Sequence, residues 1–393
     1  MKGVLGAVLL SLAGALAASA QDQQLGARTK AMGGSYTAFE DDPVSVWLNP
    51  AGIATQPNQL AISYQTYTTY PLHRELGAVG VEASAGAVTT FVDPAFIPSY
   101  LGLVFQVGSP EDAMAIGICY ARPYHLNYSF DHVEDPAQTV FVPDTNIEES
   151  FSRFRVAFAK DFRIAELGGT GFLTHVSVGL GVDIGYEHWQ FNSTTSANDT
   201  ATAPGYGAGL LVGVYDNAED LKVNFGLAYQ SAIRWHFNTD PRILPAFDMP
   251  QQLNAGMTGY FLPGLRLRTT LDLQWVEWSQ TAEEPAFVGQ PKFRDAFNYS
   301  VGVEYRYTAT PKISLYPRIG YRRFNAPWSD KDDLPMTSTF KLLLDTKGGH
   351  FDIVTAGLGI SITDERGRSW VIDLGADFGG DSFNMALGFT YEI

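Results

Sequence analysis

Apolar and polar residues alternate along most of the chain, most regularly at its C-terminus. Apolar side chains stand at every second position from Phe383 to Ile393, and small or polar residues fill the positions between them. A period of two places one set on each face of a β-strand. The same alternation covers 354–363 and 369–378, so the C-terminus is predicted to form three strands joined by two short turns.

This alternation, bounded by turn residues, predicts more strands toward the N-terminus. The predicted ranges are 58–67, 99–108, 113–122, 151–162, 173–189, 205–215, 220–231, 250–261, 264–277, 295–308 and 311–324. With the last three strands the total is about fourteen, most of them near the ~9 to 11 residues that a tilted strand needs to cross a bilayer. The predicted fold class is all-β, a transmembrane antiparallel β-barrel.

The connections between these strands alternate in length. Short ones fall at 109–112, 216–219, 262–263, 309–310 and 364–368, with a somewhat longer one at 163–172, and long ones at 68–98, 123–150, 190–204, 232–249, 278–294 and 325–350. The one exception is the hairpin at Gly379-Gly380, a short turn on the side of the long connections. Outer-membrane barrels have short periplasmic turns and longer outer loops, so the alternation favours such a barrel with the long connections outside.

Twelve charged residues within the predicted strands fall on the polar parity. They are Arg155, Asp183, Lys222, Arg266, Arg268, Asp272, Glu304, Arg306, Arg318, Arg322, Asp373 and Asp377. A charge that faces lipid at the bilayer midplane is costly, so these side chains are expected to line the lumen. A soluble sandwich would also alternate. The strand count, the turn asymmetry and the N-terminal sequence together favour the barrel.

The N-terminus resembles an export signal. Lys2 precedes an apolar run that is too short to span a bilayer, and Ala18-Ser19-Ala20 is a small-x-small cleavage site before Gln21. The predicted organisation is a signal peptide at 1–20, an N-terminal plug at 21–57 and a barrel at 58–393, located in the outer membrane of a Gram-negative type of cell. The single cysteine, Cys119, leaves no intramolecular disulfide.

Charge and motifs exclude several function classes. The chain holds 26 Lys and Arg against 42 Asp and Glu, a net charge of -16, which argues against nucleic acid as a partner. There is no G-x-S-x-G, no H-E-x-x-H and no cysteine cluster. The sequence therefore predicts no enzyme, no catalytic residue, no cofactor and no metal site.

Residues 26–54 do not alternate and read GARTKAMGGSYTAFEDDPVSVWLNPAGIA. This segment resembles the start of the FadL-like superfamily of outer-membrane proteins, including its PorV/PorQ branch, which shares a pattern close to G-A-R-x-x-x-M-G-G-x-x-x-A-x-x-D-D-x-x-x-x-x-x-N-P-A-G. The resemblance implies a fourteen-stranded barrel with its N-terminus folded into the lumen.

The matching positions are the candidate plug, or hatch, residues. They are Gly33, Gly34, Asp41, Asp42, Asn49, Pro50, Ala51 and Gly52. The Asn-Pro step fixes a turn and Ala-Gly permits close backbone packing. The alternative interpretation is a plain folding turn that leads into the first strand.

Glycines recur on the lumen parity of the strands. They are Gly102, Gly117, Gly179, Gly181, Gly207, Gly209, Gly226, Gly256, Gly302, Gly320, Gly357, Gly359 and Gly375. Glycine in a strand often marks the close approach of another backbone, which an inserted N-terminal segment would provide. Alternatively, these glycines let the strands bend and coil.

Two predicted outer loops are more apolar than exposed loops usually are. The candidate residues for capture of an apolar ligand are Phe91, Phe96, Phe340, Leu342, Leu343 and Leu344. Folded over the barrel mouth they would form a capture groove, and as strand extensions they would pair with one another.

The resemblance implies two different functions. As a FadL-like protein, the chain would take up small hydrophobic compounds of the long-chain fatty acid type, caught by loops 68–98, 123–150 and 325–350 and released inward when the plug shifts. As a PorV/PorQ-like protein it would dock secreted protein cargo in type IX secretion and conduct no ligand. Charges along the lumen weaken the uptake hypothesis, and the plug disfavours an open porin. The predicted partners are outer-membrane lipid and either a small hydrophobic ligand or secreted protein cargo.

Overall fold

The computed structural model describes most of the chain that follows the predicted signal. The described residues are 24–69, 89–91, 97–109, 112–130, 133–134, 141–142, 145–164, 171–192, 196–217, 219–236, 248–280, 294–325, 350–379 and 382–393. The predicted signal peptide at 1–20 lies outside them.

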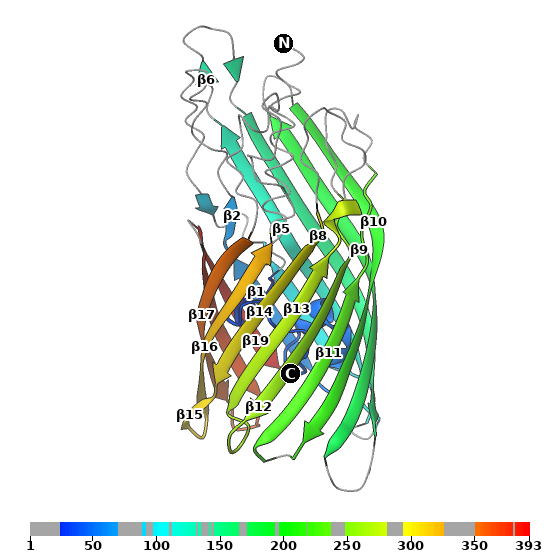
Figure 1. The fold of residues 1–393 in the computed structure, drawn as a ribbon, viewed down its shortest axis with the longest axis vertical. Coiled ribbons are helices and arrows are strands. Elements are labelled where there is room, and N and C mark those ends of the chain that lie inside the picture. Colours follow the sequence, from blue (N-terminus) through cyan, green and yellow to red (C-terminus); the bar gives the residue numbers. More distant parts are fainter. Residues whose placement is uncertain are drawn as a thin grey trace.

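One closed antiparallel sheet makes up the wall of the molecule (Figure 1). Its strands are β1 (Gln59–Gln65), β4 (Tyr100–Gln106), β5 (Met114–Phe130), β8 (Thr145–Arg163), β9 (Phe172–Asn192), β10 (Ser196–Asp216), β11 (Leu221–Gln230), β12 (Gln252–Phe261), β13 (Leu267–Val276), β14 (Ala296–Tyr305), β15 (Tyr307–Thr310), β16 (Ile313–Asn325), β17 (His350–Thr363), β18 (Ser369–Gly379) and β19 (Ser382–Glu392). β14 and β15 are two segments of one strand, because both pair with β16. The pairing of β14 with β16, and of β1 with β19, closes the ring. The predicted barrel of about fourteen strands is confirmed.

The alternation along each strand separates an apolar outer face from a polar inner one. On β9, Leu180 and Val182 are each 68% exposed and Ile184 is 61% exposed, whereas Asp183 between them is 3% exposed. A soluble protein does not expose a continuous apolar band of this kind, so the outer face is suited to lipid. Among the described residues, no helix is long and apolar enough to cross a membrane.

Two of the predicted outer loops are largely strand. β9 runs to Asn192 and β10 begins at Ser196, so the loop predicted at 190–204 is wrong. β5 and β8 likewise extend into the region predicted as loop 123–150, and the wall stands taller on that side (Figure 1). The bilayer sets only a minimum strand length, and this Thr-rich and Ser-rich sequence continues the backbone ladder beyond it.

Short strands also pair within two long connections. β2 (Tyr67–Thr69) pairs with β3 (Thr89–Phe91), and β6 (Val133–Glu134) pairs with β7 (Phe141–Val142). A short 3₁₀ turn, η2 (Trp278–Gln280), follows β13.

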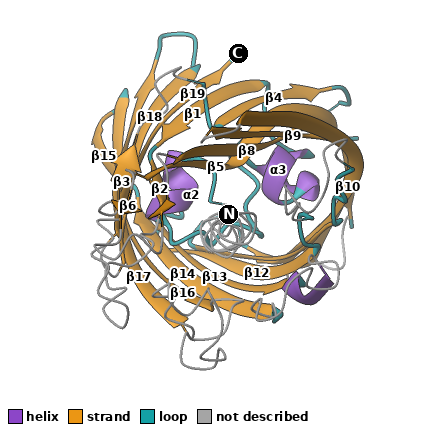
Figure 2. Ribbon diagram, turned by 90° about the horizontal axis from the view of Figure 1, so that it is seen from above, coloured by secondary structure: helices purple, strands orange, loops and turns teal. Residues whose placement is uncertain are grey.

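The described residues ahead of the barrel, 24–57, lie inside the ring of strands (Figure 2). We call them the luminal segment. They contain α2 (Ala27–Ala31), α3 (Ser45–Leu48) and the 3₁₀ turn η1 (Pro50–Ile53). Each helix is short for a local reason: Gly33 and Gly34 adopt positive φ directly after α2, and Asn49 stands between α3 and η1 in an extended conformation.

Candidate functional site

Most lumen-parity glycines lie against the luminal segment. A side chain added at these positions would meet atoms of residues 27–53. The positions are Gly117, Gly179, Gly209, Gly226, Gly256, Gly302, Gly320, Gly357 and Gly375. The close-approach interpretation is confirmed for these positions. The glycines at 102, 181, 207 and 359 instead face side chains of the barrel itself.

The Asn-Pro-Ala turn docks on the wall formed by β9 and β10. The Asn49 amide donates to the carbonyl oxygens of Thr37 (2.7 Å) and Leu210 (3.1 Å), and its Oδ1 accepts from the Ala51 nitrogen. A methyl group at Gly179 would overlap the backbone of Pro50 and Ala51. The turn therefore lies inside the lumen, in contact with the barrel wall and with another part of the luminal segment.

The other candidate plug residues lie in the same segment. Gly33 lies against the carbonyl oxygens of Tyr321 and Val301, and Gly52 lies against the Phe39 carbonyl. The structure thus brings all eight candidate plug residues into the lumen, and the positive φ of Gly33 and Gly34 explains why the pattern requires glycine there.

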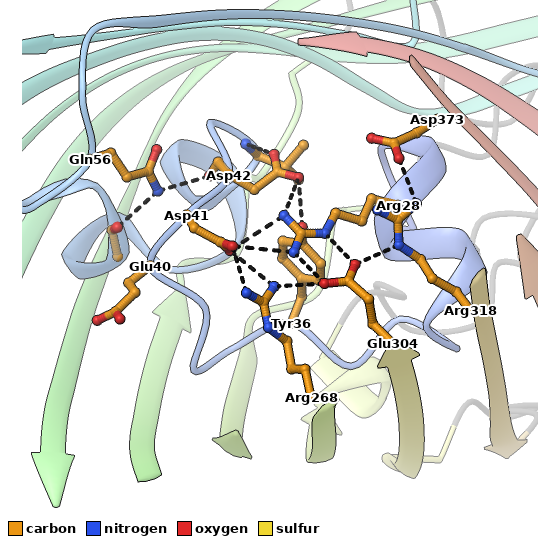
Figure 3. Close-up of polar contacts among 12 residues, drawn as sticks. Arg28, Tyr36, Glu40, Asp41, Asp42, Gln56, Arg268, Glu304, Arg318 and Asp373 are labelled. Atoms are coloured by element: carbon orange, nitrogen blue, oxygen red, sulfur yellow. Dashed lines mark hydrogen bonds and ion pairs between the residues drawn. The ribbon is translucent and has the colours of Figure 1, made fainter. Parts of the chain in front are cut away.

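An ion network ties the luminal segment to the opposite wall (Figure 3). Glu304 accepts from Arg28 of the luminal segment (2.9 Å) and from Arg318 of β16 (2.6 Å), and Arg268 of β13 lies 3.3 Å away. Asp41 pairs with Arg268 at 2.7 Å and with Arg28 at 3.2 Å. Two arginines therefore bridge a carboxylate of the luminal segment and a carboxylate of the barrel.

Further polar contacts fasten both ends of the luminal segment. Lys30 pairs with Asp377 at 2.9 Å, and both side chains are at least 98% buried. Arg155, paired with Asp183, donates to the Trp47 carbonyl at 2.7 Å and lies over the Trp47 ring.

Asp272 of the barrel wall binds the middle of the luminal segment. Its Oδ2 accepts from the backbone nitrogens of Tyr36 and Thr37 (both 2.8 Å) and from the Thr37 hydroxyl. Charge-assisted bonds to a buried carboxylate are among the stronger hydrogen bonds in proteins. The lumen charges predicted from parity are thus used largely to hold the luminal segment.

Adjacent carboxylates of the luminal segment differ in pKa. Burial raises the pKa of Asp41, but the guanidiniums of Arg268 and Arg28 outweigh burial and lower this pKa to about 2. Burial also raises the pKa of Asp42, and there Arg28 and the Tyr36 hydroxyl offset only part of the increase. Asp41 is therefore an ionised anchor across the physiological range.

The Asp41 anchor is expected to weaken only in strong acid. A carboxylate with a lowered pKa stabilises the docked segment above its ordinary pKa and loses that contribution as the pH falls through about 2. Single-channel conductance of the wild type and of Asp41→Asn, recorded from pH 6 to pH 2, measures this. We expect the difference between the two proteins to be largest above pH 4 and to vanish near pH 2. A difference independent of pH would contradict the role of Asp41.

A cavity lies between the luminal segment and the wall formed by β12, β13, β14 and β16. Its empty space, including the part that is open to solvent, is about 690 Å³. The luminal segment contributes Gln24, Thr29, Gly33, Gly34, Tyr36, Thr37 and Leu48, and the inward parity of the wall contributes Gln252, Asn254, Asp272, Gln274, Asn298, Ser300, Arg322 and Phe324. The wall residues with side-chain amides lie at the strand ends that the long connections join.

The candidate capture residues are not part of this described site. Phe91 ends β3, and nothing is described of its side chain. Phe96, Phe340, Leu342, Leu343 and Leu344 lie outside the described residues. The capture groove therefore stays a prediction.

Sequence reasoning missed the amide residues of the cavity. Gln252, Gln274 and Asn298 stand on the lumen parity at paired positions of three adjacent strands, near the strand ends that the long connections join. This shared position could have identified them from the sequence. Arg28 was part of the motif but was not selected, because its partner Glu304 is 276 residues away.

No family model and no curated protein sequence matches the chain. Solved structures do match it over nearly its full length. A FadL homologue of Pseudomonas aeruginosa is 14% identical, with a TM-score of 0.56 over 94% of this chain and 98% of that one. This chain has the FadL-type barrel fold.

Toluene transporters share this FadL-type fold. TbuX of Ralstonia pickettii is 15% identical, with a TM-score of 0.55 over 95% of this chain and 99% of that one. TodX of Pseudomonas putida is 12% identical, with a TM-score of 0.55 over 93% and 97% of the two chains. At these identities the comparison establishes the FadL-type fold and leaves the ligand to the site itself.

Proposed function

We propose that this protein is an outer-membrane channel for the passive uptake of small hydrophobic compounds, with the luminal segment as its plug. The observation that carries the proposal is the luminal segment itself. It crosses the lumen in contact with the inward-facing glycines of the wall, which we call the glycine belt, and leaves a cavity on the side of the long connections. A compound caught outside would enter that cavity and leave after a local shift of the plug. The similarity to hydrocarbon transporters supports the same function.

Charges in the lumen do not oppose this proposal in the way that the sequence suggested. Arg155, Glu304 and Asp377 are each paired with an opposite charge, and their partners include residues of the plug or the neighbouring wall. They are therefore anchors of the plug, not the lining of an open polar channel. The driving force for uptake would be the transfer of apolar area from water to a lined site, without nucleotide or redox chemistry.

Uptake of labelled compounds tests the proposal. Radiolabelled toluene, benzyl alcohol and oleate are supplied to bacterial cells that lack their own fatty acid and hydrocarbon channels and that produce this chain. We expect faster accumulation than in cells with an empty vector. A variant lacking residues 24–57 should also admit hydrophilic antibiotics, because nothing would then close the lumen.

Matched controls separate the outcomes. The barrel must be present at equal amounts in the outer membrane, measured by heat-modifiable migration in gels. Accumulation equal to that of the empty vector for all three compounds would overturn the uptake function. Co-purification of a secreted protein with the full chain would then favour the cargo-docking alternative.

A further inference from the structure

We propose that the cavity binds the uncharged polar end of an amphipathic ligand, such as a hydroxyl or carboxamide group, in preference to a bare hydrocarbon or a carboxylate. This inference rests on the proposed uptake function and narrows its substrate class. It follows from three properties of the lining. The lining contains a row of hydrogen-bonded side-chain amides, its charged groups already have partners within the protein, and a few apolar side chains line one side.

The amide ladder crosses three adjacent strands. The Gln274 amide nitrogen donates to Gln252 Oε1 at 3.1 Å, and the Asn298 amide nitrogen donates to Gln274 Oε1 at 3.0 Å. Asn298 Oδ1 in turn accepts from the Asn325 nitrogen at 2.8 Å. A side-chain amide carries two N–H donors, and the ladder uses one of them at each step. Gln274 and Asn298 can each offer their second donor to a ligand.

The charged groups of the cavity already have partners within the protein. Arg322 lies 3.5 Å from Asp377, and Asp272 accepts three hydrogen bonds from the plug. Arg323 also borders the cavity, but it stands on the outward parity of β16 and pairs with Asp352 at 2.8 Å. A ligand carboxylate would therefore compete with Asp377 and Asp352 for these two guanidiniums, and it would face the negative charge of Asp272.

The plug supplies a polar atom that still needs a partner. Thr29 is 1% exposed and lines the cavity, and its hydroxyl has no hydrogen-bond partner among the described residues. A buried hydroxyl without a partner is costly, so a ligand that donates to it or accepts from it would gain affinity. A hydrocarbon would bury this hydroxyl and the amide ladder without replacing their hydrogen bonds.

A smaller apolar side completes the site. Leu48 and Tyr36 of the plug and Phe324 of β16 line the same cavity. An aromatic or short alkyl body could pack against them while its polar end reaches the amides. The lining thus matches a neutral molecule with one apolar and one hydrogen-bonding end.

Four ring compounds of similar size test this assignment: toluene, benzyl alcohol, benzamide and benzoate. Binding to the full chain in lipid nanodiscs is measured at pH 7 by equilibrium dialysis, with empty nanodiscs as the control for partition into lipid. We expect benzamide and benzyl alcohol to bind about fivefold to tenfold more tightly than toluene, as one or two hydrogen bonds would provide. Benzoate should bind more weakly than benzamide.

A variant then locates the site. Gln274→Leu should weaken benzamide binding about fivefold and leave toluene binding unchanged. The matched control is Gln190→Leu, which makes the same change on the outward parity of β9, far from the cavity, and should alter neither. The comparison of the four compounds on the wild type stands even if Gln274→Leu does not assemble.

Each other outcome overturns the inference. Toluene binding as tight as benzamide binding would show that the amides play no part, and tightest binding of benzoate would show an anion site. Binding of none of the four would leave the cavity without this ligand class. Uptake is measured separately with toluene, benzyl alcohol and oleate, so uptake without the expected order of binding would refute the inference alone, and no uptake of any of the three would refute the uptake function.

Discussion

Replacing Glu304 by glutamine is expected to loosen the plug while the barrel stays intact. Glu304 is 3% exposed and faces the guanidiniums of Arg28, Arg268 and Arg318. Removal of one partner of a buried ion pair costs about 3 to 5 kcal/mol, because the other charges stay buried. Asp41 and Asp373 remain as partners, so a loss of about 3 kcal/mol is expected, which is a roughly hundredfold increase in the undocked population.

Cleavage by trypsin within the luminal segment measures this population. Arg28 and Lys30 are almost fully buried when the plug is docked, so cleavage there reports undocking. Conductance in planar bilayers should rise in parallel. The control is Glu365→Gln, since Glu365 is 89% exposed and pairs only with the exposed Lys312 among the described residues. Equal cleavage of Glu304→Gln and Glu365→Gln would show that the network does not hold the plug.

The barrel wall could be predicted from the sequence because each strand carries its own signal. Alternation in β17, β18 and β19 depends only on which face meets lipid, and lipid imposes that choice at every second residue. The tall ends of β9 and β10 were missed because their exposed positions, such as Thr200 and Thr202, are polar and not apolar. There the sequence keeps its β-propensity but loses the alternation.

The position of the luminal segment inside the barrel was predictable only through the resemblance and the glycines. Glycine on the lumen parity marks where a second backbone passes, and Gly179, Gly226 and Gly375 each meet a different part of the luminal segment. The ion network was not predictable. The lumen parity of Glu304 is a local property, but its pairing with Arg28 depends on how deeply the plug inserts, which no local pattern encodes.

The polar lumen and an uptake function are compatible once the plug is considered. Apolar side chains of the plug, such as Trp47 and Ile53, pack against part of the wall, and directional contacts such as those of Asp272 and Lys30 attach the plug elsewhere. These hydrogen bonds and ion pairs fix one docked position, but they weaken steeply when their distances and angles change. A segment held in this way can shift locally without unfolding the barrel.

The glycine belt gives the second large expected effect, from Gly179→Val. Valine favours strand conformation, so the barrel should assemble as well as the wild type does. The added side chain would overlap the backbone of Pro50 and Ala51, and backbone cannot move aside as a flexible side chain can. Overpacking of this kind typically costs about 1 to 3 kcal/mol, all of it at the docked Asn-Pro-Ala turn. The plug should therefore undock from β9 while the wall is preserved.

Conductance and barrel stability, measured on the same samples, separate the two effects. Gly179→Val is expected to raise conductance about tenfold with an unchanged temperature of barrel unfolding. The matched control is the next residue, Leu180→Val, whose side chain is 68% exposed on the outer face and should change neither. A variant that conducts like the wild type would mean that the turn tolerates a side chain beneath it, and the glycines would then serve the curvature of the strands and not the docking of the plug.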